Sequence, residues 1–222
     1  MPRPPLVMIT VVAALFAATA CTDTGDAAVS PLACETRMFD VQLTRDATET
    51  YNVFGELCAR GALEGRTLQV LLSGAGYGPV YWDFPYEPEN YSYVRRATDA
   101  GYATLNLPRI GITPSDRPPG EEVDIDANAD VVHDVIAALR AGDDGFGGYL
   151  TVGHSVGSVT ALAHAVRFPG ETDGIIFTGF AHATNQMNIG MLAQGSFAAS
   201  MDPKFADLPG IDGYIVSKPG LR

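Results

Sequence analysis

A serine lies at the centre of the pentad Gly-His-Ser-Val-Gly over residues 153–157. This spacing is typical of a nucleophile elbow, a sharp turn between a strand and a helix that exposes a serine hydroxyl. The flanks fit, because an apolar run over residues 149–152 precedes the pentad and an Ala-rich run over residues 156–168 follows it. The two glycines permit such a turn where strand and helix cross closely. We therefore predict that Ser155 is a nucleophile; the alternative is a glycine-rich turn whose serine caps a helix.

A serine nucleophile needs a histidine as its base and an acid that orients the histidine, in the chain order serine, acid, histidine. The sequence has four histidines. His133 lies on an expected helix before the serine, His154 lies inside the pentad, and His164 lies on the helix that follows, so we exclude these three. His182 remains a candidate base, but it directly follows the next strand, and we favour a pocket or loop role for it.

Runs typical of strands alternate with runs typical of helices through most of the chain. The strand-like runs cover residues 67–72, 102–107, 149–152 and 174–178, and the helix-like runs cover residues 89–100, 124–140 and 156–168. Within one helix-like run, Val131, Val135 and Leu139 recur every four residues and mark an apolar face. The alternation predicts an α/β fold with a mostly parallel sheet flanked by helices.

The first twenty residues have the features of an export signal. Arg3 provides a positive start, residues 6–18 form an apolar run, and three small residues end the segment. The apolar run is too short to span a bilayer whose hydrocarbon core is about 30 Å thick. We therefore expect residues 1–20 to be a signal peptide that is removed on export.

Cys21 directly follows the small residues at the end of this segment. In that place it resembles the lipobox cysteine of bacterial lipoproteins, although Ala18 stands where such signals more often have leucine. The protein is thus expected to be either a lipoprotein of the bacterial cell envelope, attached to the membrane through Cys21, or a freely secreted protein. Residues 21–33 are expected to form a tether.

Cys34 and Cys58 are the two other cysteines, and they flank two strand-like runs over residues 38–44 and 50–57. A hairpin of these runs would bring the two cysteines together, and an oxidising compartment would then join them in a disulfide. The alternative is a pair of buried thiols. We expect an N-terminal antiparallel hairpin closed by a Cys34–Cys58 disulfide.

Composition limits the partners of the protein. The chain has 222 residues, with 14 Lys and Arg against 26 Asp and Glu, and a formal net charge of −12. A nucleic-acid-binding surface needs clustered cations, so we expect no nucleic acid as a partner. The sequence also lacks the metal-binding pattern H-E-x-x-H and a dinucleotide-binding G-x-G-x-x-G after a strand, so no metal or organic cofactor is implied. The length fits one large domain.

The pentad and its flanks resemble those of the α/β-hydrolase family, and the resemblance covers residues 34–222. In that family a loop after the third strand supplies a second donor to the oxyanion hole, and here this loop covers residues 73–77. By this resemblance, the backbone N–H groups of Val156 and Ala75 would form the oxyanion hole, with Gly76 as the alternative second donor. Ser73 stands where relatives often have histidine, so the loop matches in position more than in residue type.

A second departure from the family occurs after the next strand, where relatives carry Asp-Arg-x-Gly-x-Gly-x-Ser. Pro108 replaces the acid and Pro114 lies near a usual glycine, whereas Arg109 fits the pattern. Seven aromatic residues also lie close together in the loop region before this strand: Tyr77, Tyr81, Trp82, Phe84, Tyr86, Tyr91 and Tyr93. They are either the wall of a substrate pocket, for which we name Tyr77, Tyr81 and Trp82, or rings that clamp a long loop onto the sheet.

Residues 183–222 resemble the lid region of relatives. Asp202, Asp207 and Asp212 fall within this segment, so none of them is well placed as the catalytic acid. The family would supply two further strands after residue 178, and we expect these C-terminal strands, with the base and acid they carry, to be missing from the sequence. We predict a serine hydrolase that acts on a small acyl or ester substrate through Ser155. The alternative is an exported binding or interaction protein, or a hydrolase fragment, without activity. Substrate and oligomeric state are not predicted.

Overall fold

The computed structural model describes residues 30–181, 183 and 186–220. The expected signal peptide, Cys21 and His182 lie outside the described residues, so the predictions made for them stay predictions.

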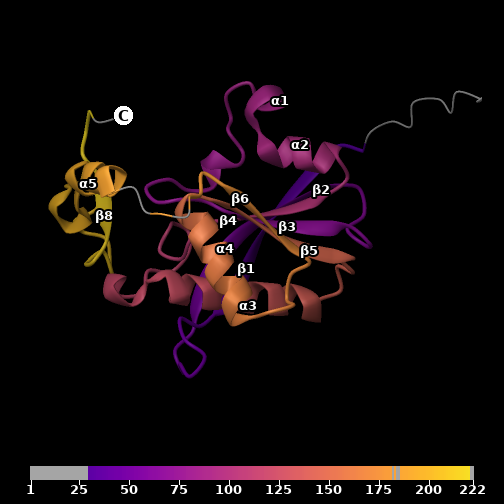
Figure 1. The fold of residues 1–222 in the computed structure, drawn as a ribbon, viewed down its shortest axis with the longest axis horizontal. Coiled ribbons are helices and arrows are strands. Elements are labelled where there is room, and N and C mark those ends of the chain that lie inside the picture. Colours follow the sequence, from indigo (N-terminus) through magenta and orange to yellow (C-terminus); the bar gives the residue numbers. More distant parts are fainter. Residues whose placement is uncertain (1–29, 182, 184–185, 221–222) are drawn as a thin grey trace, which may run out of the picture.

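A six-stranded sheet forms the centre of the fold (Figure 1). Its strand order is β1-β2-β4-β3-β5-β6; β2 runs antiparallel to both β1 and β4, and the remaining neighbours are parallel. The strands are β1 (Leu32–Val41), β2 (Tyr51–Arg60), β3 (Thr67–Leu72), β4 (Ala103–Leu107), β5 (Gly148–His154) and β6 (Gly174–Thr178). The predicted parallel sheet with an antiparallel N-terminal hairpin is confirmed.

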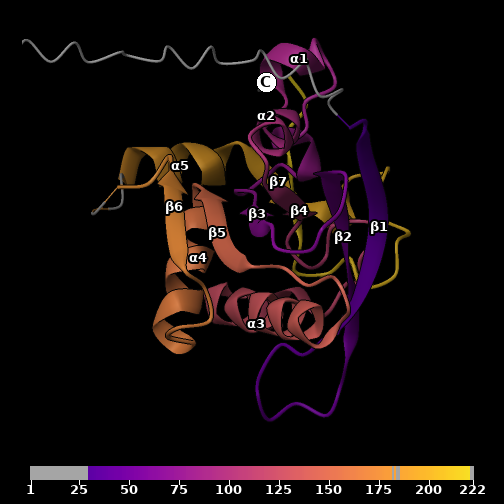
Figure 2. The same cartoon turned by 90° about the vertical axis from the view of Figure 1, so that its right-hand side faces the viewer.

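Helices cover both faces of the sheet (Figure 2). Helices α3 and α4 pack on one face, where they contact β1 and β5, and α1 and α2 lie over the other. The helical elements up to β6 are η1 (Pro79–Tyr81), α1 (Pro88–Tyr91), α2 (Tyr93–Asp99), η2 (Gly120–Glu122), α3 (Ile125–Ala141) and α4 (Val156–Arg167). None of the helices within the described ranges is both long and apolar enough to cross a membrane.

The helix predicted over residues 89–100 is in fact two helices. The first ends at Tyr91, and Ser92 takes an extended conformation before the second begins. The Ser92 side chain accepts a hydrogen bond from Arg95 N (3.0 Å) and so caps the new helix. Serine favours the first position of a helix, because its side chain can accept a hydrogen bond from one of the backbone N–H groups that have no partner there. Ser92 therefore starts a new helix instead of continuing the first one.

The core has two parts because the buried strands alternate their side chains between the two faces. On β3, Leu68, Val70 and Leu72 point to the larger core beneath α3 and α4. Leu71 points the other way and packs with Trp82 in the smaller core. This three-layer arrangement places the carboxyl ends of β3, β5 and β6 side by side at one edge of the sheet.

The chain after β6 forms a separate small unit (Figure 1). It comprises α5 (Gln186–Gln194), β7 (Ser196–Ala198), η3 (Ala199–Met201) and β8 (Ile215–Ser217), with β7 and β8 paired antiparallel. Tyr214 ties it to the loop after β4, because its hydroxyl donates to Pro118 O (2.9 Å). A Cβ on Gly213 would lie 2.8 Å from Gly120 Cα, so the two backbones touch. Its expected role as a lid stays a prediction.

A disulfide joins Cys34 and Cys58, as expected. The two residues are direct partners across the β1–β2 ladder, so they lie within the strands rather than beyond their ends. The strands extend past the cysteines because Leu32 pairs with Arg60. The structure therefore corrects the expected tether over residues 21–33, since its last two residues belong to β1.

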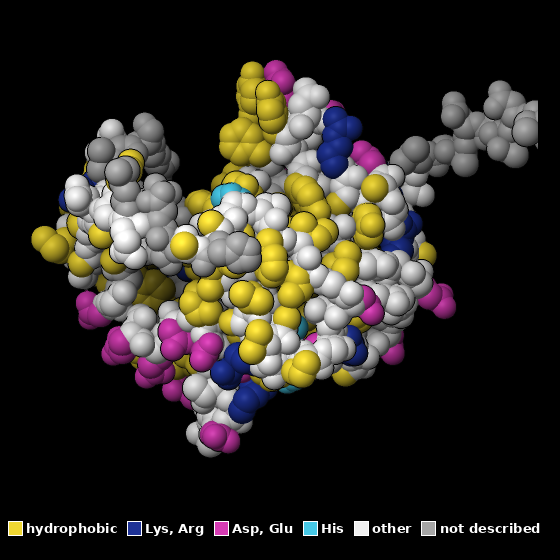
Figure 3. Space-filling view, viewed as in Figure 1, with side chains coloured by type: hydrophobic (Ala, Val, Ile, Leu, Met, Phe, Trp, Pro, Cys, Tyr) yellow, Lys and Arg dark blue, Asp and Glu magenta, His cyan; other side chains and the backbone are white. Residues whose placement is uncertain are grey.

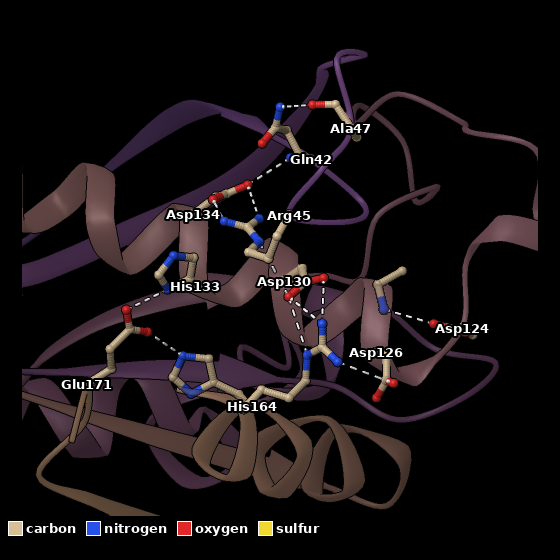
Figure 4. A network of polar contacts seen from close by, with 12 residues as sticks. Gln42, Arg45, Ala47, Asp124, Asp126, Asp130, His133, Asp134, His164 and Glu171 are labelled. Atoms are coloured by element: carbon tan, nitrogen blue, oxygen red, sulfur yellow. Dashed lines mark hydrogen bonds and ion pairs between the residues drawn. The ribbon is translucent and has the colours of Figure 1, made fainter. Parts of the chain in front are cut away.

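Charged side chains connect α3, α4 and the hairpin around the buried Asp130 (Figure 4). Arg167 on α4 contacts Asp130 on α3 (2.9 Å), and Arg45 from the β1–β2 loop reaches Asp134 (2.9 Å). At the end of this network, a single carboxylate lies between two histidines. Glu171 contacts His133 Nδ1 (2.5 Å) with one oxygen and His164 Nε2 (2.9 Å) with the other.

The disulfide predicts a loss of stability on reduction. A cross-link that closes a loop of this length restricts the unfolded chain and stabilises the fold by about 3 kcal/mol. We expect dithiothreitol to lower the free energy of unfolding of the native protein by that amount, as measured by urea denaturation. The double variant Cys34→Ala/Cys58→Ala should be less stable from the start and insensitive to the reductant. Equal unfolding curves of the native protein with and without reductant would contradict this expectation.

The buried His164 predicts that stability falls in mild acid. Burial lowers its pKa, although the contact with Glu171 opposes the shift. The unfolded chain therefore takes up a proton near pH 6.5 while the folded chain does not, and the free energy of unfolding drops as the pH falls below that value. The slope from one proton is about 1.4 kcal/mol per pH unit. Urea denaturation between pH 5 and 8 should show a smaller slope for His164→Gln, and an unchanged slope would assign the effect to other groups.

Candidate active site

Ser155 lies at the junction of β5 and α4, with φ of 54° and ψ of −119°. A positive φ is costly for a residue with a Cβ, by on the order of 1–3 kcal/mol. Besides Ser155, only Glu87 among the described non-glycine residues has such a φ. The backbone conformation is thus the one predicted for a nucleophile elbow, and the interpretation of Ser155 as an ordinary helix cap is not supported, because its side chain makes no capping hydrogen bond.

The two glycines of the pentad are required by the close crossing of β5 and α4. A Cβ on Gly153 would lie 2.5 Å from the carbonyl of Gly157. A Cβ on Gly157 would lie under 3.0 Å from Leu72 O, at the end of β3. Any side chain at either place would push the helix away from the sheet.

The end of β6 holds the elbow in place through Thr178. Ser155 N donates to Thr178 O (3.0 Å), and the Ser158 hydroxyl donates to the same oxygen (3.0 Å). The Thr178 hydroxyl donates in turn to Gly153 O (2.9 Å). Thr178 is not among the residues predicted from the sequence, where its only signal is a hydroxyl at the end of an apolar strand.

The loop after β3 faces Ser155 through Gly74. A Cβ on Gly74 would lie 3.0 Å from Ser155 Cβ and would overlap the hydroxyl of Tyr77. The Tyr77 hydroxyl and the Ser155 side chain therefore both lie close to Gly74. Gly76 is exposed and supplies the turn of the loop with φ of 81°. Val156 is the first residue of α4, and the oxyanion role predicted for it and for Ala75 stays a prediction.

His154 lies beside the serine and against two tyrosines. Its Nδ1 is hydrogen-bonded to the hydroxyl of Tyr77, and its ring stacks on Tyr81 with a centroid distance of 4.5 Å. On the other side, a Cβ on Gly179 would lie 2.5 Å from His154 Nε2. Burial lowers the pKa of His154, so the imidazole is neutral at pH 7.

Burial also raises the pKa of Tyr77, with a further contribution from Tyr81. The Ser155 hydroxyl, the Gly74 N–H and the Arg109 guanidinium act in the opposite direction, because each favours the phenolate. Arg109 follows β4, and burial lowers its pKa. Within the part of the chain that the structure describes, the buried Nε of Arg109 has no hydrogen-bond partner.

The aromatic loop packs partly in the core and is partly exposed beside Ser155. Trp82 is 4% exposed and packs in the smaller core, which favours the alternative that its ring clamps the loop onto the sheet; the substrate pocket predicted from Tyr77, Tyr81 and Trp82 stays a prediction. Tyr81 is 39% exposed, and Tyr77 is partly buried beside Ser155. Tyr86 and Tyr91 stack on one another and are exposed, and hydrophobic side chains gather over α1 in Figure 3.

His133, His164 and Asp202 have their partners away from Ser155. His133 and His164 share Glu171 in the network between α3 and α4 (Figure 4). Asp202 accepts a hydrogen bond from Lys204 N (2.9 Å) within its own turn. Over the described ranges, no histidine hydrogen-bonds directly to Ser155, and no cluster of three His, Cys, Asp or Glu side chains could hold a metal ion.

Because β5 and α4 cross closely, we predict that alanine destabilises the protein at Gly157 but not at Gly190. Gly157→Ala should lower the free energy of unfolding by about 3 kcal/mol or more, because its methyl group would overlap a backbone carbonyl. Gly190→Ala is the matched control, since nothing lies within 4 Å of a Cβ at that place on α5 and alanine favours a helix. Urea denaturation should show the loss for Gly157→Ala alone. Equal midpoints for the two variants would contradict the close crossing.

Comparisons with known proteins agree with this architecture. A model of an alpha/beta hydrolase family matches residues 69–219. The fold is similar to that of an alpha/beta hydrolase from Novosphingobium aromaticivorans, with a TM-score of 0.55, 12% sequence identity, and coverage of 76% of this chain and 53% of that chain. It is also similar to a thermophilic esterase from Thermogutta terrifontis, with a TM-score of 0.50, 15% identity, and coverage of 80% and 64%.

No curated protein sequence matches the chain. The chain spans about half the length of the first solved structures that it matches. At such low identity the solved structures establish the fold alone. The family model, however, covers more than half of the chain, and its match includes the strand, elbow and helix that position Ser155. The chain belongs to the alpha/beta hydrolase family.

Proposed function

We propose that the protein is a serine hydrolase that cleaves an ester or a similar acyl substrate through an acyl-enzyme at Ser155. The observation that carries the proposal is the positive φ of Ser155, because folded proteins retain such strain mainly where it serves a site. The similarity to a solved esterase is in line with this reaction class.

In the proposed reaction, Ser155 Oγ attacks the acyl carbon and a tetrahedral oxyanion forms. The N–H of Val156 at the start of α4 would donate to this oxyanion, together with a donor from the loop after β3, for which Ala75 is the prediction. The N-terminus of α4 carries partial positive charge, which also favours an anion. Each oxyanion donor contributes on the order of 3 kcal/mol to the transition state in such reactions. The alcohol leaves, and water then hydrolyses the acyl-enzyme.

The substrate would lie against Tyr77 and Tyr81 at the carboxyl edge of the sheet. Tyr81 offers an exposed ring, and the loop that carries it is anchored through Trp82. No metal or organic cofactor takes part in this proposal, and its substrate is a small molecule rather than a nucleic acid.

The proposal includes export. A disulfide between Cys34 and Cys58 is compatible with an oxidising compartment, where such bonds persist. Together with the expected signal peptide, it supports a protein that is secreted or held at the cell envelope through Cys21.

A binding protein without catalysis is the second candidate. One observation favours it: no histidine among the described residues bonds directly to Ser155, whereas a serine hydrolase needs a base. The two candidates differ in whether Ser155 is reactive, and a covalent probe separates them.

We expect a fluorophosphonate to label the purified protein and the Ser155→Ala variant to remain unlabelled, because the probe forms a bond to the nucleophilic oxygen. Intact-mass spectrometry measures the adduct. Ser196→Ala is the matched control, since this serine lies on β7 in the C-terminal unit and should not affect labelling. Undiminished labelling of Ser155→Ala would assign the nucleophile elsewhere, and a folded protein that is never labelled would favour the binding protein.

A further inference from the structure

Arg109 is a shielded cation without a partner at the carboxyl edge of the sheet. It lies two residues after the end of β4 and is partly buried. Within the described residues, its Nε is buried without a hydrogen-bond partner, and no carboxylate pairs with its guanidinium. Pro108 before it and Ile110 after it carry no charge that could balance it. An arginine stays protonated even when it is buried, so its positive charge is left uncompensated.

The other shielded arginines have acceptors within the described part of the chain. Arg37, Arg60 and Arg95 pair with carboxylates, Arg66 donates to backbone carbonyls, and Arg117 donates to the hydroxyl of Thr113. Removing a charge from water without pairing it costs free energy. A guanidinium that the fold shields but does not pair is therefore suited to an anion from outside the chain.

The sheet places Arg109 at the same edge as Ser155. Strand β3 lies between β4 and β5 and is parallel to both, so the three carboxyl ends lie together. Neighbouring strands lie about 4.8 Å apart, which separates the end of β4 from the end of β5 by about 10 Å. Ser155 follows β5 directly, so an extended side chain at Arg109 and a small ligand together can bridge this distance.

The turn that carries Arg109 is packed between the aromatic loop and the C-terminal unit. Ile112 N donates to Arg109 O (3.3 Å), and a Cβ on Gly78 would lie 3.5 Å from the Ile112 side chain, so the loops after β3 and β4 are in contact. On the other side, a Cβ on Gly111 would lie 2.5 Å from the Tyr214 ring. Both neighbours fix the loop beside the candidate site.

We propose that Arg109 binds a carboxylate of the substrate, so that the protein acts on esters of short dicarboxylic acids or on similar acyl compounds with an anionic end. This substrate class rests on the serine-hydrolase function proposed above. Since the Arg109 side chain spans part of the about 10 Å between the two strand ends, only a few carbon atoms would separate the carboxylate from the ester. Arg109 is a substrate-binding residue in this arrangement and takes no part in the bond changes at Ser155.

The chemistry of the guanidinium favours a carboxylate over a phosphate. Its parallel N–H groups match the two oxygens of a carboxylate, and its single positive charge balances one negative charge. A phosphate dianion needs a second cation for the same balance. The other arginine of this loop, Arg117, already donates to Thr113 (2.6 Å).

The test measures the binding of matched ester pairs by isothermal titration calorimetry, in a Ser155→Ala background so that no probe is hydrolysed. The charged probes are the monomethyl esters of succinic, glutaric and adipic acid, and the dimethyl ester of each is its uncharged partner. With Arg109 present, at least one monoester should bind about tenfold or more tightly than its dimethyl ester, because its carboxylate gains charge-assisted hydrogen bonds. Arg109→Met replaces the guanidinium with an uncharged chain of similar length and should reduce this preference to less than about threefold.

A second variant and a matched control separate binding from folding. Arg109→Lys keeps the charge but loses the parallel N–H groups, so its preference should lie between those of the other two proteins. Arg96→Met removes an exposed arginine of α2, the helix that leads to the opposite end of β4, and should keep the full preference. Urea denaturation checks each fold, and Arg109→Met should be no less stable than its parent because the cation that it removes has no partner.

A labelling experiment with Ser155 intact locates the carboxylate site. The preferred monoester should slow the reaction of Ser155 with a fluorophosphonate, whereas its dimethyl ester at the same concentration should not. In Arg109→Met the monoester should lose this protection. Protection that depends on Arg109, together with the binding preference and an unaffected control, supports the proposal.

The outcomes distinguish this substrate class from the function on which it rests. If Ser155 is labelled but no monoester is preferred, or folded Arg109→Met keeps the preference, the proposal is overturned and the hydrolase function stands without it. It is also overturned if the preferred monoester does not protect a reactive Ser155, or if inorganic phosphate binds more tightly than every monoester. If the preference depends on Arg109 but Ser155 is never labelled, the hydrolase function fails and the carboxylate site is that of a binding protein.

Discussion

The close crossing of β5 and α4 beside the end of β3 is the contact on which the rest of the site depends. Because Gly157 lies against Leu72 O, α4 begins directly at the sheet and the chain must turn at Ser155 with a positive φ. A strained backbone conformation persists only where the surrounding structure holds it in place. Thr178 on the neighbouring strand β6 holds the elbow in place, because it forms hydrogen bonds with Ser155 N, the Ser158 hydroxyl and Gly153 O.

Small residues at the same edge make room for large ones. Gly74 leaves the space that the Tyr77 hydroxyl fills, and Gly179 leaves the space beside His154. The core fixes the Tyr81 ring, because Trp82 is buried in the smaller core and packs edge-on against Tyr81 with a centroid distance of 5.0 Å. The aromatic loop is therefore part of the fold on one side and part of the candidate site on the other.

The sequence predicted what depends on local pattern and missed what depends on contacts between distant segments. The bounds of β3 and β6 follow from apolar runs, and the turn at Ser155 follows from its glycines, so these features were predictable. The contact between Tyr77 and His154 joins residues 77 positions apart, and no periodicity encodes it. Likewise, Trp82 is buried by the way its loop folds back over the sheet, although Tyr81 before it and Phe84 after it are exposed.

The chain uses its described histidines in two chemically different settings. Glu171 contacts His133 with one carboxylate oxygen and His164 with the other, so this cluster joins α3 to α4. His154 instead is hydrogen-bonded to the phenol of Tyr77, and its ring stacks on Tyr81. The difference in partner, carboxylate against phenol, separates the two settings: the first joins two helices behind the sheet, whereas the second belongs to the candidate site beside Ser155.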